Sequence, residues 1–379
     1  MSPSRHKPRM QSRTTTTVML GLAQTLAWAS SYYLPAVLAG AIGKDVGTST
    51  ATIFGAFSVA LLVAAAVGPY AGRLIDRLGG RPVLMTSNLV FAAGLAALSQ
   101  AHQASHVFAA WAVMGLAMGS GLYEAAFATV VRLHGQDARR AITGITLFAG
   151  FASTVGWPLN ALLPPALRAQ PAPSPTALAQ ETGAGLSPAL QRRAAILMAF
   201  IFAVTWFIST AMAAHLPALV QSTGATLAVA VGIAALVGPA QVAGRLIEFT
   251  FLKRAHPLLS ARFATLAHPA GALCIGWFGS SGATLFAVLH GLGNGIMTIA
   301  IGTLPLLVFG SKGYGQRQGL LMVPARIVQA GAPFVFGLAV QRWGAAALWF
   351  SAILGICACL AVAVMAVGMR TTALPSKAS

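Results

Sequence analysis

Long apolar runs separated by short polar segments dominate the chain. A helix that crosses a bilayer needs about 20 mostly apolar residues, and Gly or Pro inside such a run does not exclude it. On this criterion the pattern predicts eleven membrane-spanning helices, so the expected fold class is an all-α, polytopic membrane protein. The predicted spans are 15–41, 50–72, 82–100, 105–131, 140–163, 194–221, 225–250, 261–279, 282–309, 319–341 and 345–368.

Composition also favours a membrane protein. Hydrophobic residues make up 57% of the 379 residues and charged residues 8%, and the mean hydropathy is +0.76. A soluble domain of this size needs more charge to cover its surface. The net charge of +18 comes largely from Lys and Arg in the polar tails and the short loops between apolar runs, which is typical of cytoplasmic segments and requires no nucleic-acid partner. We therefore expect a multi-pass protein of the inner membrane, embedded in the lipid bilayer, with both termini cytoplasmic.

The two halves of the chain resemble each other. YLPAV at 33–37 matches HLPAL at 215–219, GRLID at 72–76 matches GRLIE at 244–248, and GWP at 156–158 pairs with GAP at 331–333. Three matches in the same order indicate a duplicated helical bundle. The expected domains are a cytoplasmic tail (1–14), a five-helix N-terminal bundle (15–163), a Pro/Ala-rich linker (164–193), a six-helix C-terminal bundle (194–368) and a second cytoplasmic tail (369–379).

The first bundle has no counterpart to the last helix of the second. After Pro158 the sequence finishes one span and becomes rich in Pro, Ala and Ser, with no further run long enough to cross a bilayer. Five crossings from a cytoplasmic N-terminus would put Arg192 and Arg193 outside, against the positive-inside rule. Either one bundle is misoriented, or residues 164–193 return as irregular chain, which lipid disfavours. We expect eleven helices, a disordered linker and impaired activity.

The loop between the second and third predicted spans carries GRLIDRLGGR. Its residues follow the pattern G-x-x-x-D-R-x-G-x-R, so the chain resembles a member of the major facilitator superfamily. The resemblance implies two helical bundles around a central cavity that move as rigid bodies in alternating access. It also implies secondary transport of a small solute across the cytoplasmic membrane. The pattern residues are Gly72, Asp76, Arg77, Gly79, Gly80 and Arg81.

The chemistry of this loop suggests a conformational latch. Asp76 lies at a helix end and can pair with the positive N-terminal end of a neighbouring helix or with a loop arginine, namely Arg73, Arg77 or Arg81. Contacts made in one state and broken in the other would latch the two bundles. Positive-inside topology alone explains the arginines, but not the acid among them or the paired glycines. Glu248 repeats the acid in the second half without the glycines, so we expect a weaker latch there.

Glu124 and Arg326 are the clearest charged residues inside predicted spans. Charges there are costly and few. Glu124 is the candidate coupling residue, because it could take up a proton; it could also bind a basic substrate, or form a structural ion pair with Arg326 or a loop arginine. Arg326 could hold a carboxylate or phosphate bidentately, or extend to the cytoplasmic interface.

Other polar and aromatic residues are candidates for a substrate cavity. Tyr32 and Tyr33 occupy the place in the first half that His215 occupies in the second, so these duplicated positions could face one cavity or anchor the outer interface. Buried amides could complete the site or pack helices. His215 and His290 could titrate near neutral pH or be hydrogen-bonded structure. The full candidate set is Tyr32, Tyr33, Trp206, His215, Asn294, Arg326 and Gln329.

Enzymatic chemistry has no supporting residues in the sequence. There is no Walker loop or nucleophile elbow, and the three cysteines lie in apolar runs without metal-ligand spacing. We therefore expect no enzyme activity, no cofactor and no metal. The predicted function is secondary active transport of a small solute, with an ion gradient and protons as candidates for coupling. An organic anion is favoured by the arginines and tyrosines, whereas apolar cavities would suit a hydrophobic drug. A transport-impaired paralogue or a sensor is the alternative.

Overall fold

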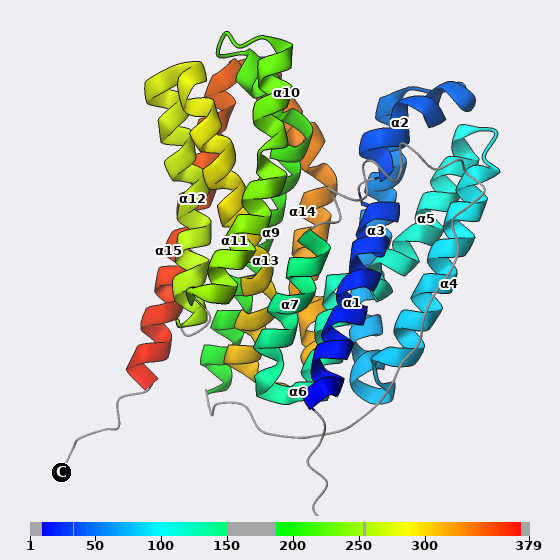
Figure 1. Ribbon diagram of the computed structural model, residues 1–379, viewed down its shortest axis with the longest axis vertical. Helices are drawn as coiled ribbons and strands as arrows, with labels where there is room; N and C mark the ends of the chain where they lie inside the picture. Colours follow the sequence, from blue (N-terminus) through cyan, green and yellow to red (C-terminus); the bar gives the residue numbers. More distant parts are fainter. Residues whose placement is uncertain (1–9, 33, 151–186, 253–254, 373–379) are drawn as a thin grey trace, which may run out of the picture.

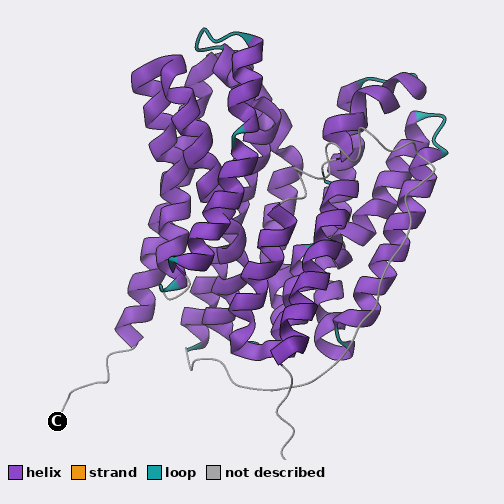
Figure 2. Ribbon diagram, in the orientation of Figure 1, coloured by secondary structure: helices purple, strands orange, loops and turns teal. Residues whose placement is uncertain are grey.

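Helices form nearly all of the described chain (Figure 2). The computed structural model describes residues 10–32, 34–150, 187–252 and 255–372, and these residues contain no strand. The predicted all-α class is confirmed.

Seven continuous helical stretches of the described residues are long and apolar enough to cross a membrane. Three of them, Ala104–Phe148, Pro257–Phe309 and Tyr314–Val367, contain 45, 53 and 54 residues. A single crossing takes about 20 residues, so each of these has the length of two crossings, and each folds back at a short 3₁₀ turn. The chain is therefore a multi-pass membrane protein, while the predicted count of eleven spans stays a prediction.

The first half is built around α5. This helix packs against both α3 and α4, while α1 packs against α7. Trp111 and Phe127 are fully buried in a hydrophobic cluster that unites these helices. The elements are α1 (Met10–Ser30), α2 (Leu34–Asp45), α3 (Thr50–Leu78), α4 (Gly80–Ser99), α5 (Ala104–Gly121), α6 (Tyr123–His134), η1 (Gly135–Ala138) and α7 (Arg139–Gly150).

The second half repeats this pattern of helix contacts. Here α13 packs against α11 and α12, as α5 does against α3 and α4, and α14 packs against α9, as α7 does against α1. A further helix, α15, covers α12 and α9. The duplication expected from the sequence is thus present in three dimensions. The elements are α9 (Pro188–Gln221), α10 (Leu227–Ala235), α11 (Val237–Thr250), α12 (Pro257–Phe278), η3 (Gly279–Gly282), α13 (Ala283–Phe309), α14 (Tyr314–Trp343), η4 (Gly344–Ala346) and α15 (Ala347–Thr372).

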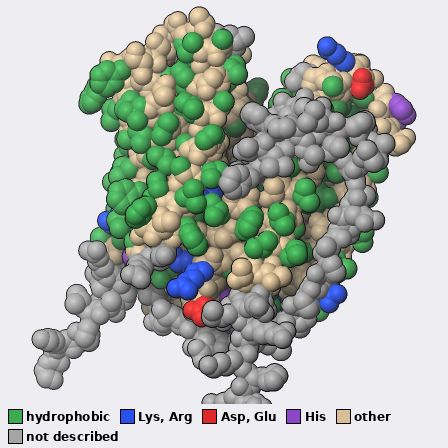
Figure 3. All heavy atoms as spheres, viewed as in Figure 1, with side chains coloured by type: hydrophobic (Ala, Val, Ile, Leu, Met, Phe, Trp, Pro, Cys, Tyr) green, Lys and Arg blue, Asp and Glu red, His purple; other side chains and the backbone are tan. Residues whose placement is uncertain are grey.

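Both halves have the same orientation. In Figure 1, α1 and α9 each begin at the lower edge, so neither bundle is inverted relative to the other. On the face drawn in Figure 3, apolar side chains cover the broad middle and most charged ones lie near the edges. Residues 188–193, assigned to the linker, belong to α9. The remaining linker and the GWP segment fall within 151–186, outside the described residues.

Three predicted spans are each divided into two helices. Proline explains two divisions: Pro35 and Pro239 lack the N–H that would bond to the carbonyl four residues earlier, close to the ends of α1 and α10. The third division separates α5 from α6 at Leu122, whose backbone is extended. Gln24 of α1 donates to the Gly121 carbonyl at 2.7 Å, so the interruption is satisfied by buried protein, as the bilayer requires.

The halves meet along α3 and α14, where four glycines let the backbones touch. A Cβ on Gly319 would lie 2.6 Å from the carbonyl oxygen of Gly68, and one on Gly72 would overlap the carbonyl of Gly315. These obstructing atoms are backbone, so no rotamer change relieves them. Further up, Ser58 donates to the Ala330 carbonyl at 3.2 Å. Towards the upper edge the outline is hollowed between the two groups of helices (Figure 3).

We predict that Gly319→Ala opens the lower end, because the new methyl meets backbone and overpacking costs about 1–3 kcal/mol. Spin labels at the exposed residues Gln136 and Lys312, one in each half, should move apart in a cysteine-free background. Gly331→Ala is the matched control on the same helix, because nothing lies within 4 Å of its Cβ position. Equal distances in both variants would contradict a crossing that depends on glycine.

Candidate functional site

Asp76 joins the first half to the second through a helix N-terminus. Its carboxylate accepts hydrogen bonds from the backbone N–H groups of Gly315 at 2.9 Å and Gln316 at 2.8 Å. These are first-turn donors of α14, which begins at Tyr314, and they have no partner within their own helix. The positive end of the helix dipole favours the carboxylate there. The sequence offered two kinds of partner for Asp76, a loop arginine or the N-terminal end of a neighbouring helix. In the structure its partner is the N-terminal end of α14.

The remaining pattern residues shape the turn that holds Asp76. Gly79 has φ of +93°, a conformation that favours glycine. A Cβ on Gly80 would overlap the side chain of Thr129 on α6. Arg132 of α6, which the pattern does not include, donates to the Asp76 carbonyl and, at 3.2 Å, to that of Ile75. Two arginines of the pattern, Arg77 and Arg81, are exposed.

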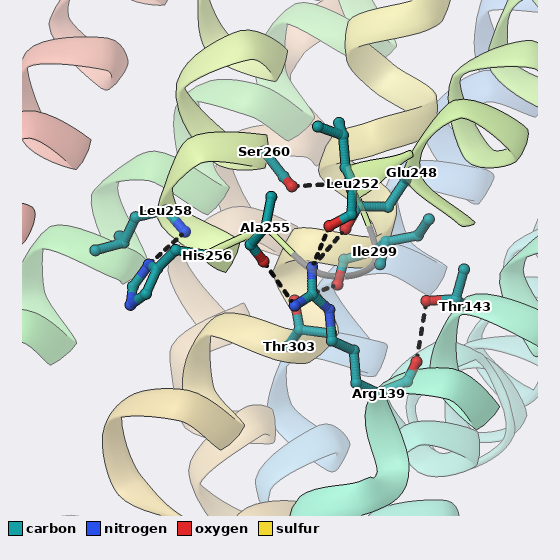
Figure 4. Close-up of polar contacts among 10 residues, drawn as sticks. All are labelled: Arg139, Thr143, Glu248, Leu252, Ala255, His256, Leu258, Ser260, Ile299 and Thr303. Carbon is teal, nitrogen blue, oxygen red and sulfur yellow. Dashed lines mark hydrogen bonds and ion pairs between the residues drawn. The ribbon is translucent and has the colours of Figure 1, made fainter. Parts of the chain in front are cut away.

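A second acid makes an ion pair between the halves. Glu248 of α11 pairs with Arg139 of α7 at 2.9 Å and accepts a hydrogen bond from Ser260 at 2.7 Å (Figure 4). Arg139 also donates to the carbonyls of Ala255 at 2.9 Å and Leu252 at 3.1 Å. The Glu248 side chain is 2% exposed and that of Arg139 24%. The sequence predicted a weaker latch at Glu248 but did not identify Arg139 as its partner. The position of Arg139 at the start of the fifth predicted span was the one indication that it could lie near this contact.

A polar chain crosses the interface at its centre. Glu124, in the first turn of α6, pairs with Arg326 of α14 at 2.8 Å. The guanidinium donates to Gln329 Oε1 at 3.1 Å, and the Gln329 amide donates to the Tyr32 hydroxyl at 2.8 Å. That hydroxyl lies 3.2 Å from the hydroxyl of Thr210 on α9. Arg326 is 5% exposed, so it does not extend to the interface with water.

An aromatic ring covers one side of the Arg326 guanidinium. The cation lies 5.2 Å from the ring centroid of Trp206, a distance at which the ring face attracts it. Trp206 in turn stacks on Trp28 of the first half, with centroids 6.2 Å apart and planes within 6°. Among the described residues the buried Nε1 of Trp206 has no hydrogen-bond partner. The site therefore combines a cation, a carboxylate and an unused donor.

Four of the seven cavity candidates thus meet at the interface: Tyr32, Trp206, Arg326 and Gln329. His215 lies elsewhere, with Nε2 2.8 Å from the Pro333 carbonyl. Asn294 donates to Ser209 at 3.0 Å and lines a separate cavity in the second half. Tyr33 is outside the described residues.

Comparisons with known proteins agree with this architecture. Residues 20–166 match the sequence model of the Major Facilitator Superfamily. The multidrug resistance protein MdtL of Klebsiella pneumoniae (strain 342) is 36% identical over 110 residues, which are 28% of this chain and 28% of that protein. The chain therefore aligns with only about a quarter of this curated relative's length.

Solved structures extend the likeness to the whole described fold. The transporter FucP, in the outward conformation, has a TM-score of 0.70 at 14% identity, covering 96% of this chain and 100% of that one. The human organic anion transporter MFSD10 has a TM-score of 0.63 at 17% identity, covering 94% and 100%. The fold and the contacts between its halves define a duplicated, multi-pass helical protein. Residues 20–166 of this chain are thus similar to the Major Facilitator Superfamily, and the solved structures that share its fold are described as transporters.

We predict that Arg139→Met lowers stability by about 3 kcal/mol, because it leaves Glu248 buried without its cation; the value is at the low end for buried pairs since Arg139 is 24% exposed. Adding Glu248→Gln should restore most of the loss. Arg140→Met, at the exposed neighbouring position, should change stability by about 0.5 kcal/mol or less. Thermal unfolding in detergent measures the wild type, the two single variants of the pair, the double variant and Arg140→Met, and additive losses in the double variant would contradict the pairing.

Proposed function

We propose that this protein is a secondary active transporter that moves a small organic anion across the cytoplasmic membrane by alternating access. The observation that carries the proposal is Arg326, a buried cation of one half whose counter-charge, Glu124, belongs to the other. A cation held in this way loses its partner whenever the halves part. A transport cycle that parts them therefore creates and removes an anion site.

The orientation follows from charge. The ends of α3, α6 and α9 that carry Arg77, Arg132 and Arg192 lie at the same edge of the molecule, together with the start of α14. The positive-inside rule assigns this edge to the cytoplasm of an inner-membrane protein. Asp76 and the four glycines at the contact between α3 and α14 lie nearer this edge than the hollowed upper edge. We therefore infer that this structure is closed towards the cytoplasm. The match to a transporter in the outward conformation supports the same state.

The closed cytoplasmic end is held by a small number of contacts between the halves. Asp76 binds the first turn of α14, and Arg139 binds Glu248 beside the first turn of α7. Both contacts can be exchanged for water when the end opens, because polar groups gain hydration as they separate. They act as latches that favour the outward-facing state without making it permanent.

The chemistry around Arg326 suits a carboxylate or a phosphate ester. The planar guanidinium can bind either group bidentately. The unused Trp206 Nε1 is placed to donate to a further acceptor, and the Tyr32 ring and stacked tryptophans offer apolar faces. Of the matched proteins, MFSD10 is described as an organic anion transporter and MdtL as a multidrug resistance protein; the buried Arg326 is what favours an anion here.

Glu124 couples proton uptake to anion binding in this proposal. While ionised it occupies Arg326 at 2.8 Å; when protonated it loses most of its attraction for the guanidinium. Uptake of a proton at Glu124 would therefore free Arg326 for the anion, which couples the two ligands. A structural ion pair with no coupling role is the competing interpretation, and the two differ in what a neutral substitution does to transport.

We predict that Asp76→Asn reduces anion flux at least about tenfold, because charge-assisted hydrogen bonds to α14 are worth about 1.5–3 kcal/mol. The apolar spans are unchanged, so membrane insertion should persist. The assay is uptake of labelled carboxylates and phosphate esters by proteoliposomes with an imposed pH gradient. Asp45→Asn, which removes an exposed acid, is the control. Flux equal to wild type in Asp76→Asn would rule out the latch, and binding without flux in the wild type would indicate a sensor.

We predict that Glu124→Gln abolishes accumulation against a gradient but leaves downhill exchange, because the amide cannot carry a proton between the two sides. The same proteoliposomes report both modes, with exchange measured at equal pH on the two sides. If both modes are lost and the melting temperature falls, the Glu124–Arg326 pair is structural.

A further inference from the structure

Two histidines of the second half form a buried chain that lies apart from the proposed substrate site. His268 of α12 and His290 of α13 are each 5% exposed, and their Nδ1 atoms are 3.1 Å apart. His268 Nε2 lies 3.0 Å from the hydroxyl of Ser351 on α15, which is fully buried. Three helices are thus linked by hydrogen bonds within the apolar interior.

One assignment of the hydrogen atoms gives this chain a direction. If the Ser351 hydroxyl donates its hydrogen to the Leu348 carbonyl at 2.8 Å, it accepts from His268 Nε2–H at 3.0 Å. In neutral His268 the other nitrogen, Nδ1, is then an acceptor. His290 must therefore donate from Nδ1, which leaves its Nε2 without a hydrogen. Every donor points from His290 towards Leu348, and the free lone pair of the chain is at His290 Nε2.

In the described part of the chain, the surroundings of the pair offer a proton an aromatic ring face and a route for water, but no counter-ion. The ring of Phe286 lies parallel to that of His290 at 5.8 Å, and a ring face attracts a cation. A small cavity beside both histidines has polar lining from Thr205, Thr265 and Asn294, through which water can approach.

Among the described residues, no ionisable side chain other than the two histidines lines the cavity beside them. Towards the cavity, α9 presents Val204, Thr205 and Ile208, and α15 presents Gly355 and Ala358. On the α11 side, Ala240 and the backbone of Gln241 contact α13. The nearest charged residues along these helices, about six residues or more from the histidines, are Arg245 and Glu248 of α11 and Arg262 of α12. Among the described side chains, the remaining ionisable groups on α9, α12 and α15 are Arg192, Arg193, His215, Cys274, Cys357 and Cys359, and none of them lines the cavity.

We propose that the His290–His268–Ser351 chain is a proton-binding site of the second half, which takes up one proton at His290 Nε2. The resulting imidazolium donates from Nδ1 to His268 Nδ1, so the charge-assisted bond tightens an existing contact and requires no rearrangement. This site is separate from Glu124 and exists whether or not the protein transports an anion.

Nitrogen-15 NMR of histidine-labelled protein in bilayers tests the proposal directly. At alkaline pH, His268 should carry hydrogen on Nε2 only and His290 on Nδ1 only. On acidification, the His290 signals should become those of an imidazolium while His268 keeps its neutral form. The variants His290→Gln and His268→Gln assign the signals among the 8 histidines of the chain. Reversed tautomers, or a neutral His290 at every pH at which the protein stays folded, would overturn the site.

Ser351 provides a second, conservative test. Ser351→Ala removes the acceptor that fixes His268, so the single tautomer of His268 should become a mixture, whereas Ser351→Thr should retain it. His215→Gln, which changes a histidine outside the chain, should leave both signals unchanged. An unaltered His268 tautomer in Ser351→Ala would contradict the derived direction. The NMR measurement does not depend on solute flux. If His290 takes up a proton in a protein that shows no transport, the proton-binding site is supported and the transporter proposal is contradicted.

Discussion

Charge burial governs how the two halves of this protein fit together. An unpaired charge inside an apolar protein costs several kcal/mol. Among the described residues, the three acids that are not exposed, Asp76, Glu124 and Glu248, all take partners from the opposite half. Separation of the halves therefore requires each of these acids to exchange its protein partner for water or for a ligand.

The duplication explains where these acids lie but not how they are satisfied. Asp76 and Glu248 occupy equivalent positions in GRLID and GRLIE, and each lies beside the start of the fifth predicted span of the other half. In one case the backbone of α14 provides the donors; in the other a side chain, Arg139, does so. At the two equivalent positions, a helix N-terminus therefore neutralises Asp76 and an ion pair neutralises Glu248. A duplicated sequence can diverge in this way because either device neutralises the acid.

Apolar periodicity predicted the class, three matched segments predicted the duplication, and the loop pattern predicted the glycine turn near Asp76. Four polar and aromatic residues named from the sequence do meet at the interface, while their role in a substrate site stays a prediction. These patterns could not predict pairings that depend on how the halves are docked, such as Arg139 with Glu248, because residues 109 positions apart have no local signature. The division at Leu122 was also missed, since it is stabilised by Gln24 from a distant helix. His268 was overlooked because its importance arises only from His290 and Ser351 beside it.

The division at Leu122 makes the central ion pair unequal. It gives α6 an N-terminus of its own, and Glu124 lies in the first turn, where the helix dipole of its own half favours a negative charge. Among the described residues of its own half, the polar and ring contacts of Arg326 are with neutral groups, namely Gln329 and the ring of Trp206. When the halves separate, the helix dipole therefore still stabilises the Glu124 charge, whereas the Arg326 charge is left without a counter-ion. The cost of separation falls mainly on Arg326, so the empty interface has a chemical preference for negative charge before any substrate arrives.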